Sequence, residues 1–162
     1  MPEKELRVEL LRVSPSPEET VALAAKLCYA GGDVDALLQK ISQTDQAAFV
    51  EKVMGMGHES VLEHPSFTFL VEGVSRALLA QLTRHRIASF SVQSQRYVDY
   101  ESGFGYIVPP AIRALGAEAE SEYHAEMAQM QRWYSAWREK LGGDKLANAD
   151  ARFVLPKACE TR

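Results

Sequence analysis

The sequence predicts a helix-rich α+β fold, a single domain with a small and mainly antiparallel sheet. Two short segments, near residues 6–13 and 66–72, alternate apolar and polar residues as half-buried strands do. Elsewhere apolar residues recur at helical spacing, most clearly over a long amphipathic stretch near residues 117–141. The chain has 162 residues, which is about one domain, and 46% of them are hydrophobic, enough to bury a core. We therefore expect one domain over residues 1–162.

The first third of the chain has the pattern of a strand followed by three helices. Apolar residues alternate with charged ones from Leu6, which predicts a strand through about Val13. Ser16 followed by Pro17 and two glutamates is typical of a helix start, with Ser16 as the cap. The expected helices cover residues 17–29, 33–41 and 45–54, with glycines after the first and the last.

The remaining elements alternate between strand and helix patterns. Residues 66–72 place aromatic or aliphatic side chains at every second position, which predicts a strand that Gly73 ends. Ser75 is a suitable cap for a helix that reaches about Arg84. The last expected elements are a strand at 106–108 ended by Pro109 and Pro110, a helix at 117–141, and a helix at 144–154 ended by Pro156. We expect the residues that follow, up to Arg162, to be mobile.

Charge and composition exclude several classes of protein. The net charge is −4, which argues against a general binder of nucleic-acid polymers. No uncharged run is long and apolar enough to span a bilayer, and the first residues do not resemble a secretory signal, so we expect no membrane partner. Cys28 and Cys159 lack the spacing of a redox motif, so we expect them to be inert, reduced thiols in a cytoplasmic protein.

One segment departs from this acidic average. Residues 76–98 contain four arginines and no acidic residue, in a chain whose net charge is −4. These arginines are Arg76, Arg84, Arg86 and Arg96. Guanidinium groups bind phosphate and carboxylate oxygens through paired hydrogen bonds and keep their charge, so the segment favours an anionic, nucleotide-like ligand. A solvated basic face is the simplest alternative, and a surface for single-stranded RNA is a weaker one because few aromatic residues accompany the arginines.

The same segment carries a recognisable motif. Arg84-His85-Arg86, seven residues and then Ser94 resembles the RHR-x7-S signature of the flavin-dependent thymidylate synthase family. The segments Gly57–Ser60 with Glu63-His64, and 151–156, agree with that family in order and spacing, so the resemblance covers nearly the whole chain. The fold it implies is that family's helix-rich α+β fold.

The resemblance implies an activity and a set of ligands. Members of the family make dTMP from dUMP, with methylenetetrahydrofolate as the one-carbon donor and with FAD and NADPH as the reducing system. They work as homotetramers whose active sites lie between subunits. We therefore expect dUMP and folate as small-molecule partners, FAD as cofactor, and a homotetramer.

The resemblance also assigns site residues. The residues implied to contact FAD are His58, Ser60, Arg84, His85, Arg86 and Val92. Those implied to contact dUMP are Gln81, Arg84, Val92, Gln93, Ser94, Gln95, Arg96 and Arg152. Val92 stands where family members often carry Glu or Gln, so only a backbone contact is expected from it.

No catalytic residue is expected within the chain. The family pattern continues past residues 151–156 to an Asn-Ala-Arg segment and a later arginine, which lie beyond Arg162. We expect little or no turnover by these 162 residues alone, and a non-catalytic fragment that binds nucleotide or flavin is the alternative function. No metal is expected either, because His58 and His64 lack a third ligand.

Two further groups have simple structural interpretations. His124 is expected at the surface of the long helix, among glutamates. Trp133, Tyr134 and Trp137 on that helix are expected in the core or in an interface between subunits, and the apolar surface there favours an oligomer.

Overall fold

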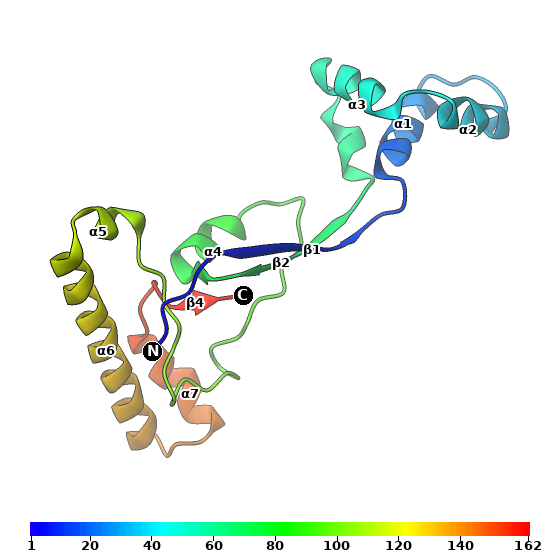
Figure 1. Ribbon diagram of the computed structural model, residues 1–162. Helices are drawn as coiled ribbons and strands as arrows, with labels where there is room; N and C mark the ends of the chain where they lie inside the picture. The colour runs from blue at the N-terminus through cyan, green and yellow to red at the C-terminus, as the bar shows by residue number, and fades with distance from the viewer. The chain divides into compact units, whose positions relative to one another are not determined.

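The computed structural model describes residues 1–162, with seven α-helices and four short strands (Figure 1). The helices are α1 (Pro17–Leu27), α2 (Val34–Ser42), α3 (Gln46–Gly55), α4 (Arg76–Leu82), α5 (Pro110–Ala114), α6 (Ala117–Lys140) and α7 (Lys145–Ala151). The strands are β1 (Arg7–Val13), β2 (Phe67–Glu72), β3 (Val74–Ser75) and β4 (Glu160–Thr161), and two 3-10 turns are η1 (Glu59–Glu63) and η2 (Arg152–Val154). The predicted helix-rich α+β class is confirmed.

The residues group into two compact units. One comprises residues 9–69, and the other comprises residues 1–8 and 70–162. Strand β1 pairs with β2 in one two-stranded sheet, and β3 pairs antiparallel with β4 in another. The organisation as a single domain stays a prediction.

The 9–69 unit is built from α1, α2, α3 and η1. Its core contains Val21, Ala25, Val53 and Val61, which come from α1, α3 and η1. Asp33 and Asp45 cap α2 and α3 by accepting hydrogen bonds from backbone N–H groups of the first turn, which is why both helices begin where the sequence predicts. The prediction that Ser16 caps α1 is wrong: its backbone is left-handed, with φ 45°, and its side chain makes no capping bond.

The second unit packs α6 and α7 against the chain's last residues. Its core contains residues from four separate segments: Tyr100, Phe104, Tyr106, Val108, Met127, Tyr134, Ala151 and Cys159. Ser75 caps α4 by accepting a bond from Leu78 N–H, as predicted. Gly73 precedes β3 with φ +68°, and a Cβ there would collide with the Glu5 carbonyl oxygen, so this close approach requires glycine.

Three other sequence predictions fail in this unit. Residues 106–108 form no strand, because only Tyr106 makes bridges, one to Glu3 and one to Cys159. Pro110 begins α5 instead of only ending a strand, since a proline fits the first turn of a helix. The residues up to Arg162 are held by β3–β4 pairing and by a 2.8 Å bond from Gln93 N–H to the Arg162 carbonyl oxygen, which contradicts the expected mobility. No helix of the chain has the length and apolar character needed to cross a membrane.

Candidate functional site

The end of α4 presents three of the motif residues to solvent. The backbone N–H groups of Arg84 and His85 bond to the carbonyls of Gln81 and Leu82, which closes the helix. Beyond this turn Arg84, His85 and Arg86 are exposed, and neither arginine pairs with a carboxylate. Gln81 is exposed on the last turn of the same helix. The positive charge is therefore available to an anion from outside the chain.

The loop at residues 92–96 is held from two sides. A guanidinium nitrogen of Arg76 donates a 2.6 Å hydrogen bond to the Gln93 carbonyl oxygen. Gln93 N–H donates to the Arg162 carbonyl oxygen at 2.8 Å. Gln95 donates from its side chain to the Cys159 sulfur at 3.5 Å, so that amide faces the interior. Val92 is half-buried in the same loop. These contacts fix the loop's backbone before any ligand arrives.

Ser94 and Arg96 lie at the C-terminal end of this loop. The Ser94 hydroxyl accepts a bond from Arg96 N–H at 3.3 Å, and its carbonyl accepts from Tyr97 N–H at 3.2 Å. The Arg96 guanidinium donates to the Tyr97 hydroxyl at 2.9 Å and lies 5.2 Å from the centre of that ring. Arg96 forms no ion pair within the chain, so its charge can serve a ligand while Tyr97 orients it.

Polar groups are buried behind the loop. Burial raises the pKa of the Cys159 thiol to about 11, and a hydrogen bond from Gln95 and the charge of Arg76 only partly oppose this rise. Burial also raises the pKa of Tyr100 to about 12. Both groups are protonated at neutral pH, which makes Cys159 an inert core residue, consistent with the sequence interpretation. Arg76 is half-buried and holds the loop through Gln93, so its role is structural. The other three arginines of the segment, Arg84, Arg86 and Arg96, are exposed.

Arg152 lies where α7 passes into η2. Its Nε donates to the Ala149 carbonyl oxygen at 3.0 Å, and its guanidinium lies 5.9 Å from the centre of the Phe153 ring. Its other guanidinium nitrogens are left for a ligand. Arg152 and the 81–96 segment belong to one compact unit, whereas His58 and Ser60 belong to the other.

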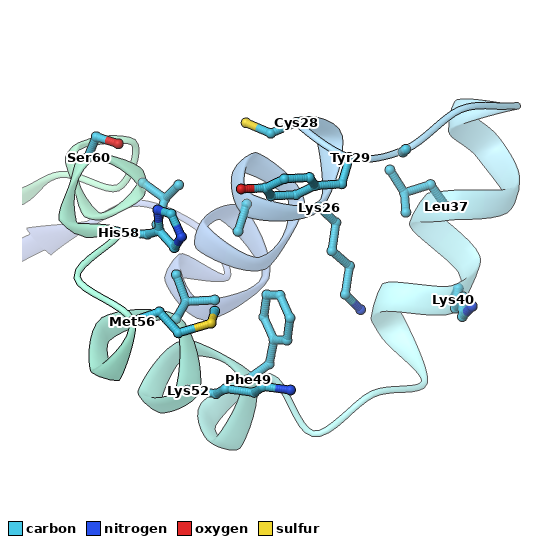
Figure 2. Close-up of a pocket in the computed structure, with 14 residues that line it drawn as sticks. Lys26, Cys28, Tyr29, Leu37, Lys40, Phe49, Lys52, Met56, His58 and Ser60 are labelled. Atoms are coloured by element: carbon cyan, nitrogen blue, oxygen red, sulfur yellow. The ribbon is translucent and has the colours of Figure 1, made fainter.

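His58 and Ser60 line a cavity of about 580 Å³ in the 9–69 unit (Figure 2). Tyr29, Phe49 and Met56 give it an apolar and aromatic lining, and Cys28 lies at the end of α1 beside it. The volume is typical of a small-molecule site, and aromatic rings with histidine and serine donors fit a planar heteroaromatic ring such as a flavin.

Three lysines also line this cavity, and sequence reasoning missed them. Lys26, Lys40 and Lys52 come from α1, α2 and α3. Figure 2 shows their amino groups away from the side that carries His58 and Ser60. No motif links residues so far apart in the sequence, so only the packing of the three helices shows that they share a cavity.

A further cluster of ionisable groups surrounds His124. A carboxylate oxygen of Glu3, one of Glu120 and an imidazole nitrogen of His124 lie within 4.8 Å of one another. Arg113 forms ion pairs with both glutamates. The Tyr106 hydroxyl lies 2.6 Å from His124 Nδ1. His124 therefore lies at the surface of α6 beside Glu120, as the sequence predicts, with 39% of its side chain exposed. The contact with Tyr106 also makes it part of a network that joins the N-terminus to α6.

Comparisons with known proteins agree with the motif. Residues 9–162 match the model of the family described as thymidylate synthase complementing protein. A flavin-dependent thymidylate synthase of Geobacter sulfurreducens is 48% identical over 97% of this chain and 66% of its own length. One of Clostridium tetani is 43% identical over 97% of this chain and 67% of its own. The chain thus spans about two thirds of the length of these relatives.

A solved structure shows the same fold. The chain superposes on a UMP/dUMP methylase, PolB, of Streptomyces cacaoi with a TM-score of 0.72 and 23% identity, covering 98% of this chain and 71% of the other. Since the family model covers almost the whole chain and a sequence relative is nearly half identical, the chain belongs to the thymidylate synthase complementing protein family.

Proposed function

We propose that this chain carries the nucleotide- and flavin-binding surfaces of a flavin-dependent thymidylate synthase, which methylates dUMP reductively to dTMP. The observation that carries the proposal is the pair Arg84 and Arg96. Both are exposed and lack a carboxylate partner, in a segment whose loop is already braced by Arg76. A preorganised cationic site of this kind binds a phosphate without a large ordering cost.

The proposed dUMP site includes side chains and backbone groups. Arg84, Arg96 and Arg152 supply positive charge for the phosphate and the uracil oxygens, while Gln81 and Ser94 supply neutral hydrogen bonds. Gln93 contributes through its side-chain amide, because both of its backbone polar groups are engaged within the chain. Val92 and Gln95 contribute through their backbones, since Val92 has no polar side chain and the Gln95 amide is engaged with Cys159.

The proposed cofactor is FAD. Arg84, His85, Arg86 and Val92 contact it from one chain, and His58 and Ser60 contact the same flavin from a neighbouring chain of the assembly. When bound, the flavin supplies the hydride chemistry, and the residues of this chain bind and orient the reactants. Methylenetetrahydrofolate and NADPH are the proposed co-substrates. The cytoplasm is the proposed location, supported by the two free thiols Cys28 and Cys159.

A homotetramer is the proposed assembly. The long helix α6 leaves Trp133 and Trp137 each 50% exposed, which is unusual for the largest apolar side chain. The β1–β2 sheet likewise exposes several large apolar residues, including Val8, Leu10, Phe67 and Phe69. A second copy covering such surfaces would also bring the two halves of the proposed site together from different chains.

Spectroscopy and calorimetry on the purified chain test this function. A bound flavin gives an absorption band at about 450 nm, and dUMP releases or absorbs heat on titration. We expect both signals. A colourless protein that takes up neither added FAD nor dUMP would contradict the proposal.

A further inference from the structure

Three lysines that line the same cavity lie near the C-terminal ends of three different helices. Lys26, Lys40 and Lys52 each lie in the last turn of α1, α2 and α3. The Lys26 amino group lies 4.8 Å from the centre of the Phe49 ring, so at least this cation is next to the aromatic lining. None of the three forms an ion pair within the chain, and none of the cavity's fourteen lining residues is acidic.

A purely structural role does not account for all this charge. A lysine in the last turn of a helix offsets the negative end of the helix dipole, which equals about half an elementary charge. Three such helix ends carry about −1.5 against +3 from the lysines, which leaves a net positive charge at the cavity. Asp33, beside the smaller hollow that shares Lys40, is engaged as the cap of α2 and accepts bonds from Asp35 and Ala36 N–H.

The rest of the lining indicates what kind of molecule this charge would hold. Tyr29, Phe49 and Met56 offer an apolar surface for a planar ring, and His58 with Ser60 offers polar contacts at the other side (Figure 2). A ligand that satisfies the whole cavity therefore has an aromatic ring and an anionic group attached to it.

We propose that Lys26, Lys40 and Lys52 form an anion-binding wall that holds the charged end of the ring-bearing ligand in this cavity. The inference rests on the proposed function, under which two ligands have the required chemistry. One is the dinucleotide flavin, with its pyrophosphate, and the other is a folate, with the carboxylates of its glutamate tail. Both present oxygen anions that ammonium groups bind.

Ligand series that differ only in charge test the wall. Riboflavin, FMN and FAD are titrated into the full chain, and so is folic acid carrying one or five glutamates. The variant is Lys26→Gln/Lys40→Gln/Lys52→Gln, with Lys145→Gln as a control, since Lys145 is an exposed lysine on α7 in the other unit. Thermal melting of each variant confirms that it is folded.

The expected result is selective for charge. Each lost lysine should weaken binding of the anionic ligand about threefold to fivefold, and the triple variant about 30-fold or more, with a flatter dependence on salt. Riboflavin should change by less than about twofold, and a triple Lys→Arg variant should retain most of the affinity. A loss confined to FMN and FAD assigns the wall to the cofactor phosphates. A loss that grows with the number of glutamates assigns it to the folate tail.

The contrary result is equally clear. Unchanged affinity of the triple variant for every anionic probe, or a loss as large for riboflavin as for FAD, overturns the anion-binding wall. In that case retained dUMP binding through Arg84 and Arg96 would leave the proposed function standing. If instead the unchanged chain bound no dUMP, while the triple lysine variant still lost affinity for the anionic ligands, the proposed function would fail and the anion-binding wall would stand.

Discussion

A nitrogen of the Arg76 guanidinium donates a 2.6 Å hydrogen bond to the carbonyl oxygen of Gln93. This contact joins the first turn of α4 to the loop that carries Ser94 and Arg96, 17 residues further along the chain. The Gln93 N–H donates to the Arg162 carbonyl oxygen, so the loop is held between the Arg76 guanidinium and the last residue of the chain. The proposed phosphate site thus depends on a residue that need not touch the phosphate.

Replacing this arginine should affect stability and binding together. Arg76→Ala removes a charged hydrogen bond that is partly buried, so we expect the free energy of unfolding to fall by about 1.5–3 kcal/mol in urea titration. The affinity for dUMP should also fall, because the loop loses its brace. Arg76→Lys should recover part of both losses. Equal stability of Arg76→Ala and the unchanged chain would show that the brace is unimportant.

The buried thiol predicts a loss of stability in alkali. Burial raises the pKa of Cys159 from 9.0 to about 11, so the folded chain holds this proton more tightly than the unfolded chain does. The resulting stability is complete below about pH 9 and is lost as the pH rises through about 11. Between pH 8 and about pH 10.5 the loss from this group should be about 2 kcal/mol.

Cys159→Ala isolates this contribution. Urea titrations of the variant should show a shallower fall over the same pH range, with the remainder owed to groups such as Tyr100, whose pKa burial raises to about 12. The same pH dependence in both proteins would mean that Cys159 ionises as freely in the folded chain as in the unfolded one.

The two thiols should differ in reactivity, and ligand should protect only one of them. Cys28 is exposed and lines the cavity of the 9–69 unit, whereas Cys159 is fully buried. We expect a thiol reagent to modify Cys28 first and FAD to slow that reaction, measured by mass spectrometry. Cys28→Ser should abolish the fast phase. A rate for Cys28 that saturating FAD leaves unchanged would argue against flavin in this cavity.

The exposed tryptophans of α6 predict an interface. Light scattering at tens of micromolar should give a mass above that of the 18.0 kDa monomer. If α6 forms the contact, replacing Trp133 and Trp137 with serine should lower this mass without loss of helical content, because Tyr134, not the tryptophans, fills the core. A monomer mass at every concentration would contradict the predicted oligomer.

Local signals explain which parts of the fold the sequence predicts. The caps Asp33, Asp45 and Ser75 act within one turn of their own helices, so their pattern is sufficient. Ser16 precedes a helix and carries a hydroxyl, as Ser75 does, but its backbone is left-handed and its side chain makes no capping bond. The residues near Tyr106 pair with positions about 50 and 100 residues away, and no local pattern reveals that.

The candidate site also contains residues that a local pattern predicts and residues that only the fold brings together. The sequence alone predicts the arginines after α4, because their motif is contiguous. The structure adds that Arg84 and Arg86 are exposed and form no ion pair with a carboxylate. Arg76 belongs to the same charged window, but its bond to Gln93 depends on how the chain folds back, so composition alone cannot separate it from the others. Lys40 reaches the cavity only because α2 packs beside α1.

Titration of dUMP into the chain and two arginine variants tests the central claim most directly. The matched control is Arg132→Ala, since Arg132 is an exposed arginine of α6 whose guanidinium donates hydrogen bonds to Gln129 and forms no ion pair. Arg84→Ala and Arg96→Ala should each weaken dUMP binding by about 1.5–3 kcal/mol, the value of a charge-assisted hydrogen bond, while the control stays unchanged. Affinity for dUMP that is the same in all four proteins would contradict the assignment of these arginines to the nucleotide phosphate.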